Sequence, residues 1–295
     1  MSSPNLSDAV PAFKESLGSH YDPSQHSDIL LGRFLKARNF DVPLATAMFI
    51  KWREWYVQER VDDILQTFTF PELPALREIY PRFQHKTDKQ GRMVVYNQFG
   101  KLDVSKIFQI TTPERMLTYE IRESEKLEKY RFPALSKKAG RNVDKVVLVL
   151  DVAGFPFMQF YRIQAVLGKI AENNSNYHPE TLGQVLIINA PFIFKAIWKL
   201  IINIIPAETA AKCNILGSDY QETLLNLIDA ENVPKFFGGT CECPGGCERA
   251  DVGPWNDGTV KGYPDEFWEG FRKRDLDAAA AAAAAAAGIS ASDEK

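Results

Sequence analysis

Hydrophobic positions in the first part of the chain recur at the spacing of an α-helix. Ser27 precedes the segment DILLGRFLKAR, and Asp41 precedes VPLATAMFIKWREWY. Ser and Asp are typical N-caps, and Pro43 fits a first helical turn. The apolar residues repeating along these segments are Ile29, Leu30, Phe34, Leu35, Leu44, Met48, Trp52 and Trp55. The pattern predicts a small amphipathic bundle that ends at FPELP, residues 70–74.

Beyond this point the apolar residues form short runs. Runs typical of strands lie at 92–99, 145–151, 184–190 and 212–217. Three of them are continuously apolar, as strands buried in a parallel sheet are. Helices are expected between them, at 113–130, at about 157–174 and at 191–205. This alternation predicts an α/β fold in which a helical N-terminal bundle is followed by a mostly parallel sheet.

The segment APFIFKAIWKLIINIIP, residues 190–206, has an unusual pattern. Between its flanking prolines only Lys195, Lys199 and Asn203 are polar, and their spacing places them on one stripe of a helix. A bilayer span needs about 20 apolar residues, and this run is shorter and interrupted by lysines. It is therefore expected to lie at an interface and not to cross a membrane; an ordinary buried core helix is the alternative.

Composition and charge exclude some classes of function. The chain has 295 residues, of which 45% are hydrophobic and 25% charged, in the ordinary range for a globular protein with one large and one small domain. A net charge of -3 argues against nucleic-acid binding. No secretory signal is visible at the start. The run Ala278–Ala287 receives no functional assignment.

Motifs for catalysis and for metals are sparse. The chain has no G-x-S-x-G, G-x-G-x-x-G, Walker or H-E-x-x-H motif, so we expect no enzyme. The segment CECPGGC holds three of the four cysteines, Cys241, Cys243 and Cys247. Zinc could take three thiolates with a His or Cys213, but the spacing is not the common C-x-x-C, so we interpret them as free thiols and expect no metal. His85 and His178 are interpreted as hydrogen-bonded structural residues.

Two short segments favour an anion. YHPETLG holds Glu180 before a buried strand, and PAETAAK holds Thr209 and Lys212 at a helix start, where free N–H groups receive anions. A basic stripe, Arg33, Lys36 and Arg38, lies beside Phe34 and Phe40. From spacing alone, the simpler explanations are favoured: a helix cap with a surface ion pair for the two segments, and a solvated helix face for the basic stripe.

Several segments together resemble one family. LLGRFLKARNFDV, HKTDKQGR, LDVAG, NYHPETLGQVLIINAPFIF, PKFFGGT and GPW, all within residues 27–256, are similar to the CRAL-TRIO lipid-binding proteins, specifically the fungal Sec-fourteen-type phosphatidylinositol transfer proteins. The resemblance implies a helical N-terminal domain at 1–70, a CRAL-TRIO lipid-binding domain at 71–256 and a C-terminal extension with the alanine run at 257–295.

In this family a sheet forms the floor of an apolar pocket, and a mobile helix is its lid. The resemblance assigns the helix at 191–205 as that lid, with the apolar residues Phe192, Phe194, Ile197, Trp198, Ile201 and Ile202. Each buried acyl methylene contributes about 0.8 kcal/mol, so the pocket must be as apolar as the membrane. Gly238 and Gly239 match the family's glycine pair and are expected to be the lid hinge.

The resemblance also implies a phosphatidylinositol headgroup site at Arg38, Glu180, Thr209 and Lys212. Arg38 and Lys212 would neutralise the phosphate, and Thr209 would donate a hydroxyl hydrogen bond. Glu180 would accept from inositol hydroxyls or orient Lys212. Asn39 replaces a residue that is often Lys in the family, which removes one charge.

The second lipid of the family, phosphatidylcholine, is not expected here. Its choline and phosphate partners are tyrosines and small hydroxyl residues, and the matching positions of this chain are Gln84, Val95, Ser124, Val146 and Leu148. We therefore expect phosphatidylinositol to be exchanged against a less polar lipid or against none. A register shift of one residue, which would bring in Tyr96 for Val95, is the alternative.

The function expected from the resemblance is lipid exchange without catalysis or cofactor. The chain would bind phosphatidylinositol, carry it between membranes and present it to a phosphatidylinositol kinase. The resemblance implies a cytoplasmic monomer that associates transiently with Golgi or endosomal membranes. A carrier or sensor of another apolar ligand, such as a sterol or haem, is the alternative.

Overall fold

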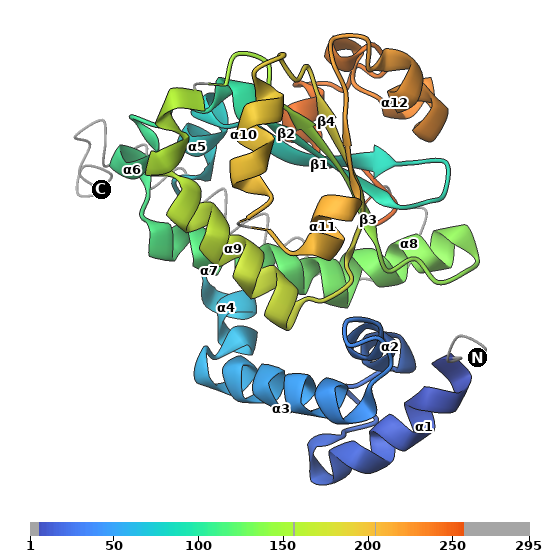
Figure 1. Ribbon diagram of the computed structural model, residues 1–295. Helices are drawn as coiled ribbons and strands as arrows, with labels where there is room; N and C mark the ends of the chain where they lie inside the picture. Colours follow the sequence, from blue (N-terminus) through green and yellow to red (C-terminus); the bar gives the residue numbers. More distant parts are fainter. Residues whose placement is uncertain (1–5, 156, 204, 257–295) are drawn as a thin grey trace, which may run out of the picture.

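The computed structural model describes residues 6–155, 157–203 and 205–256. A group of helices at the N-terminus packs beneath a larger α/β domain (Figure 1). The predicted C-terminal extension at 257–295 lies outside the described residues. Within the described part of the chain, every helix is too short or too polar to cross a bilayer.

The N-terminal helices begin where the sequence predicts. The Ser27 side chain accepts a hydrogen bond from the Leu30 amide, and the Asp41 side chain accepts one from the Leu44 amide, so both N-caps are confirmed. The helices of this region are α1 (Leu6–Leu17), α2 (Asp28–Lys36), α3 (Val42–Gln58) and α4 (Val61–Thr67), whereas the next helix, α5 (Leu73–Ile79), packs in the α/β domain.

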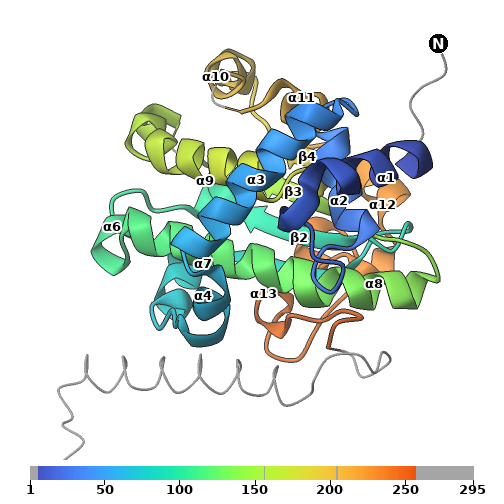
Figure 2. The ribbon, with the colours of Figure 1, turned by 90° about the horizontal axis from the view of Figure 1, so that it is seen from below.

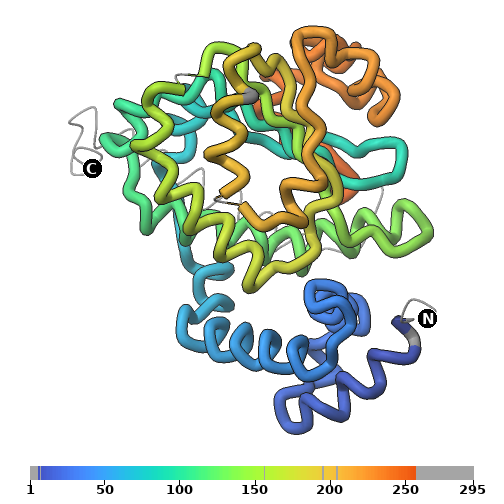
Figure 3. The backbone as a smooth tube through the Cα atoms, in the orientation of Figure 1, coloured from blue at the N-terminus to red at the C-terminus, as the bar shows by residue number. Residues whose placement is uncertain are grey.

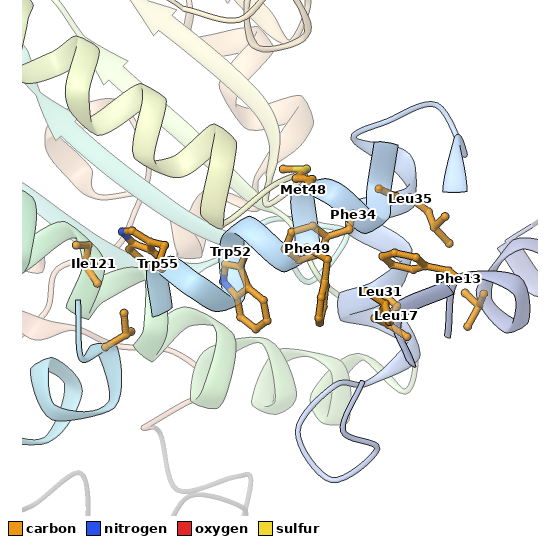
Figure 4. Packing of buried hydrophobic residues seen from close by; sticks show 13 residues of the cluster. Phe13, Leu17, Leu31, Phe34, Leu35, Met48, Phe49, Trp52, Trp55 and Ile121 are labelled. Atoms are coloured by element: carbon orange, nitrogen blue, oxygen red, sulfur yellow. The ribbon is translucent and has the colours of Figure 1, made fainter. Parts of the chain in front are cut away.

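Aromatic rings fill the centre of the bundle. Phe49 makes edge contacts with Phe13 and Phe34 at centroid distances of 5.9 and 5.1 Å, and Trp52 lies 5.0 Å from Phe49 (Figure 4). Leu44 is not part of this core, because its side chain is 55% exposed. The helical period of α3 is therefore correct, but its first turn faces the core with Ala45 and not with Leu44.

The sheet has five strands whose spatial order equals their order in the chain. They are β1 (Arg82–Thr87), β2 (Met93–Gln98), β3 (Val146–Asp151), β4 (Leu182–Ile188) and β5 (Cys213–Ile215). β1 pairs antiparallel with β2, and the other neighbours are parallel, as predicted. β1 was not predicted, since its segment RFQHKT is polar and only alternate residues near its start are buried.

Alternate residues of the strands face two different environments. On one face Val94, Tyr96, Val149 and Leu186 pack with Leu224 of α12 (Gln221–Leu227) and with the chain that follows it. We call this the back face. On the front face Val95, Leu148 and Ile187 line a cavity. The sheet thus has one fully packed face and one face that floors an internal space.

Helices surround the front of the sheet. Figures 1 and 3 show the chain from α9 through β4 to α10 and α11 running around that side. The front helices are α6 (Ile107–Ile110), α7 (Pro113–Lys126), α8 (Phe132–Ala139), α9 (Gln164–Tyr177), α10 (Phe194–Ile201) and α11 (Ala207–Ala211). A π-helical turn, Leu127–Arg131, joins α7 to α8, and α13 (Cys247–Ala250) lies near the C-terminal end of the described chain.

The helix predicted at 191–205 is shorter than expected. The amides of Asn189 and Ala190 still bond to Gly217 and Leu216, which holds this end of the chain to the segment after β5. The helical region α10 begins only at Phe194, with no side-chain cap at Ile193. Residues 191–193, which the apolar pattern assigned to the helix, instead form a turn between β4 and α10.

The bundle is joined to the α/β domain by an aromatic stack and an ion pair. The rings of Trp55 in α3 and Tyr177 in α9 stack at 4.0 Å with 5° between their planes. Arg33 of α2 makes a two-pronged ion pair with Glu128, and both side chains are largely buried. In Figure 2 α3 passes across α9 and toward α7 on the underside of the larger domain.

Candidate ligand-binding cavity

A cavity of about 490 Å³ lies between the front of the sheet and the helices around it. Most of its lining is apolar. The larger apolar residues are Phe99, Leu102, Ile107, Leu148, Leu150, Phe155, Phe160, Ile163, Leu167, Ile187, Phe194, Trp198 and Ile201. Such a lining excludes ordered water and accommodates hydrocarbon.

One side of α10 closes this cavity. Phe194, Trp198 and Ile201 line it, as the prediction for the covering helix requires. Phe192 and Ile202 do not, since Phe192 is 90% exposed and Ile202 is also exposed, and Ile197 is half-buried outside the lining. The helix therefore presents apolar side chains to the cavity and to solvent at the same time. Its movement as a lid stays a prediction.

All four residues predicted for the headgroup line this one cavity. Arg38 follows α2, Glu180 precedes β4, Thr209 lies in α11 and Lys212 precedes β5. The Lys212 ammonium lies 3.4 Å from Glu180 Oε2. The Arg38 guanidinium donates a 2.7 Å hydrogen bond from Nη1 to the Ala37 carbonyl, which restrains the side chain. The structure brings these residues together from separate parts of the chain.

Sequence reasoning missed a further cation, Lys145, whose Nζ lies 3.3 Å from Glu180 Oε2. Lys145 precedes β3, Glu180 precedes β4 and Lys212 precedes β5. Parallel strands place their amino ends at the same edge of a sheet, so these three residues meet there. Polar residues just before three parallel strands were the signal that could have found Lys145.

Glu180 is held as a charged carboxylate in an uncommon backbone conformation. Its φ is 59°, in the left-handed region that residues other than glycine rarely adopt. Burial would raise its pKa, but the charges of Lys212 and Lys145 outweigh burial and lower it. A strained backbone at a charged cavity residue is typical of functional sites. With Arg38, the group carries more positive than negative charge and so favours an anion.

A second polar group lies at another part of the lining. Arg131 donates two hydrogen bonds of 3.0 Å to Glu123, and Arg82 is paired with Glu120. The Tyr80 hydroxyl accepts a 2.7 Å bond from Asn97. Burial opposes ionisation of Glu123, yet the charges of Lys126, Arg131 and Arg122 lower its pKa. These charges compensate one another, which distinguishes them from the cationic group around Glu180.

The five positions predicted for the second lipid all line the cavity: Gln84, Val95, Ser124, Val146 and Leu148. Tyr96 lies on the back face, where its ring stacks on Phe83 and Phe237 at 5.3 Å. The alternative register that would bring Tyr96 to this site is therefore wrong. Tyr80, which we did not single out, is the aromatic hydroxyl that does line the cavity near Gln84.

The predicted hinge glycines lie on the other side of the sheet. Gly238, at φ 90°, ends a 3-10 turn over Lys235–Phe237, and Phe237 belongs to the back-face cluster. A Cβ on Gly239 would lie 2.0 Å from the Val233 carbonyl oxygen, so close packing requires glycine there. A hinge role for this pair stays a prediction and would have to act on α10 across the sheet.

The two histidines differ from the prediction. His178 lines the cavity, and its Nε2 is buried without a hydrogen-bond partner in the described structure. Burial, with the nearby Arg33 charge, lowers its pKa to about 3, so the ring is neutral. His85 is buried on the back face, and its Nε2 faces Cys241. His85 therefore has the expected hydrogen bond through one ring nitrogen, whereas its Nδ1 and the Nε2 of His178 have none among the described residues.

Family models match both parts of this architecture. Residues 78–239 match the CRAL/TRIO domain, and residues 11–51 match the CRAL/TRIO N-terminal domain. The chain belongs to the CRAL/TRIO family.

Individual relatives indicate which members of the family the chain resembles. The chain is 40% identical over 230 residues to the Sec14 cytosolic factor of Schizosaccharomyces pombe, covering 78% of this chain and 80% of that one. It is 38% identical to the SEC14 cytosolic factor of Candida glabrata, over 83% of this chain and 82% of that one. It is 39% identical to an Arabidopsis thaliana protein named phosphatidylinositol/phosphatidylcholine transfer protein SFH4, over 85% of this chain but only 42% of the plant protein.

A solved structure confirms the fold. The crystal structure of Sfh5 superposes with a TM-score of 0.64 and covers 92% of this chain and 94% of that one, at 17% sequence identity. The helical N-terminal region and the mostly parallel sheet predicted from the sequence are thus those of the family.

Proposed function

We propose that this chain binds phosphatidylinositol and transfers it between membranes. One observation carries the proposal: Arg38, Glu180, Thr209 and Lys212 all line a single, mostly apolar cavity, and Lys145, outside that lining, pairs with Glu180. A cationic group beside a hydrocarbon-compatible space suits an amphiphile with an anionic, hydroxyl-bearing headgroup. The Arabidopsis relative named phosphatidylinositol/phosphatidylcholine transfer protein SFH4 supports the same substrate class.

Each polar residue has a distinct part in binding. Arg38 and Lys212 neutralise the phosphodiester, and Lys145 adds to the same positive field. The Thr209 hydroxyl donates to an oxygen of the headgroup. Glu180 accepts hydrogen bonds from inositol hydroxyls, and the two lysines stay oriented by its carboxylate. These separate roles explain why the carboxylate of Glu180 lies among positively charged side chains.

The transport cycle depends on α10. Closed, its Phe194 and Trp198 cover the acyl chains; open, its exposed apolar residues enter the membrane surface. The protein acts as a monomeric carrier in the cytoplasm that visits Golgi or endosomal membranes and presents phosphatidylinositol to a kinase. It performs no catalysis and takes the lipid as ligand, not as cofactor.

Phosphatidylcholine is the second candidate ligand, since the Arabidopsis relative is named for both lipids. In this chain Val95, Val146 and Leu148 offer its phosphate no hydrogen bond, although Ser124 and Tyr80 lie in the same cavity. An unpaired buried polar group costs about 1–3 kcal/mol. We infer that phosphatidylinositol transfer exceeds phosphatidylcholine transfer, which labelled lipids of both kinds will show.

The headgroup assignment is tested by a double variant, Arg38→Ala with Lys212→Ala. Removing two charge-assisted contacts of about 1.5–3 kcal/mol each should lower phosphatidylinositol transfer at least tenfold. The control, Lys51→Ala with Lys101→Ala, removes the same charge from two exposed lysines that do not line the cavity and should transfer normally. Circular dichroism verifies folding. Unchanged transfer by a folded Arg38/Lys212 variant would refute the assignment.

Native mass spectrometry of the gently purified protein separates this function from its alternative. A co-purified phosphatidylinositol mass supports the proposal. A sterol or haem mass contradicts it, since neither uses the inositol-facing carboxylate.

A further inference from the structure

Four potential metal ligands meet on the back face of the sheet. They are His85 of β1, Cys241 and Cys243 in the segment after the glycine pair, and Cys247 at the start of α13. Their ligand atoms all lie within 4.8 Å of one another. This cluster is separate from the lipid cavity, whose lining includes none of the four residues.

The distances within the cluster resemble the edges of a coordination tetrahedron. His85 Nε2 lies 3.4 Å from Cys241 Sγ, and Cys241 Sγ lies 3.7 Å from Cys243 Sγ. Zinc bonds of about 2.3 Å to sulfur and about 2.0–2.1 Å to nitrogen give tetrahedral edges of about 3.5 Å between N and S and about 3.8 Å between two sulfurs. These two distances match tetrahedral edges, and the remaining ligand atoms lie within 4.8 Å of one another.

Protein groups satisfy these side chains poorly. His85 is fully buried, its Nε2 faces only the Cys241 sulfur, and its Nδ1 has no hydrogen-bond partner among the described residues. The Tyr96 hydroxyl is buried without a partner in the same part of the structure and interacts electrostatically with Cys241 and Cys247. Buried polar groups are normally paired, and a metal bond at Nε2 would give the buried imidazole a stronger partner than the Cys241 thiol.

We propose that His85, Cys241, Cys243 and Cys247 bind one structural Zn²⁺. The three thiols lose their protons to solvent and bind as thiolates, and the neutral imidazole binds through the Nε2 lone pair. Zinc keeps its charge, so no oxidant or reductant takes part, and the site carries a net charge of -1. Four protein ligands leave no open position, which makes the site structural and not catalytic.

This conclusion departs from the expectation of free thiols. The cysteines follow a C-x-C-x-x-x-C spacing that lacks the common C-x-x-C pair, and the fourth ligand is 156 residues away from Cys241. Only the path of the chain across the back of the sheet brings His85 to the cysteines. Cys213, the other ligand considered from the sequence, lies in β5 with its thiol directed at the Thr209 carbonyl.

The ion would fasten the C-terminal part of the described chain to the edge strand. After Cys247 the chain passes β1, where the Lys86 amide bonds to the Val252 carbonyl at 2.6 Å. It then buries Trp255 against Met93 and Val95. A metal bond to His85 thus secures a segment that covers an edge strand and supports the β2 residues beside the cavity.

Zinc content of the purified full-length chain tests the site. We expect one zinc per chain by elemental analysis after dialysis, and cobalt substitution should give the sulfur-to-metal charge-transfer absorption of tetrahedral thiolate sites. Cys243→Ser and Cys247→Ser should lose the metal. Cys213→Ser is the matched control and should keep it, and His85→Cys should also keep it because thiolate replaces imidazole.

Folding is followed separately so that a misfolded variant does not decide the outcome. Wild-type protein treated with a strong zinc chelator should show a lower melting temperature that zinc restores. The proposal would be overturned if wild-type protein that has been incubated with zinc and dialysed contains no metal and shows three free thiols at these positions. A Cys241–Cys243 disulfide, seen as the loss of two hydrogens by mass, would overturn it too. Neither result bears on phosphatidylinositol transfer.

Discussion

Glu125 is a carboxyl buried where the N-terminal bundle meets the α/β domain. Its nearest cation, Lys129, is 3.8 Å away, and its other polar neighbours are the Tyr56 hydroxyl at 3.4 Å and His178 at 3.9 Å. Burial, only partly offset by Lys129, raises the pKa of Glu125 to about 7. The folded protein therefore holds a proton there that the unfolded chain releases at lower pH.

We predict that Glu125→Gln removes a pH dependence of stability. A raised folded-state pKa contributes stability that is present below the ordinary value of 4.5 and is lost as pH rises through about 7. The loss is of the order of 3 kcal/mol at most. Thermal unfolding should show the variant more stable than wild type at pH 8 and nearly equal near pH 4. The exposed control Glu54→Gln should follow wild type at both pH values.

The position of a single residue at the cavity was predictable from the sequence where that residue lies within a motif of the family. Arg38, Glu180 and Lys212 each sit in a segment that resembles the family, and the structure brings them to one cavity. Pairs formed across the fold were not predictable. Arg82 and Glu120 meet only because β1 lies beside α7, and no local pattern announces such a contact.

At the scale of elements, α10 combines features that a core helix does not have. It closes the cavity with one side and exposes Leu200 on another, and no side chain caps its N-terminus. Uncapped helices with apolar residues facing solvent open at low cost. We predict faster hydrogen exchange in Phe194–Ile201 than in the buried strand Val146–Asp151, with protection changed by phosphatidylinositol liposomes. Equal protection under both conditions would identify α10 as core.

A matched pair of variants tests whether α10 contacts the membrane. Leu200 is 59% exposed on α10, and Val57 is 68% exposed on α3 of the bundle. Inserting a leucine side chain into hydrocarbon is worth about 1.5–3 kcal/mol, so Leu200→Ser should weaken liposome binding about tenfold or more. Val57→Ser should bind as wild type does. Equal binding by both variants would place the membrane contact elsewhere.

Strands were predictable from the sequence pattern when their residues form an apolar run. The apolar runs of β2, β3 and β4 identify buried strands, whereas β1 is polar and at the sheet edge. The extent of α10 was not predictable, because residues 191–193 have the same apolar pattern as the helix, yet they form a turn after the chain has paired at Asn189 and Ala190.

At the scale of the whole molecule, the Arg33–Glu128 ion pair links the helical N-terminal bundle to the α/β domain. Arg33 is buried and Glu128 is 19% exposed, so removing the cation leaves a poorly solvated carboxylate. We predict that Arg33→Ala lowers the free energy of unfolding by about 3 kcal/mol. Lys106→Ala, which breaks a more exposed pair with Asp103, should change it by no more than about 0.5 kcal/mol. Urea titration of both variants measures the difference.

Strand order along the sheet follows the order of synthesis. A strand leaving the ribosome thus finds its partner already made, and the sheet can grow one strand at a time. The edge of β1 is the exception, because the Val252 carbonyl that bonds to it is translated long after Lys86. Until that late segment emerges, the outer edge of β1 in the nascent chain is unpaired, and slow translation past residue 216 should make the chain more dependent on chaperones.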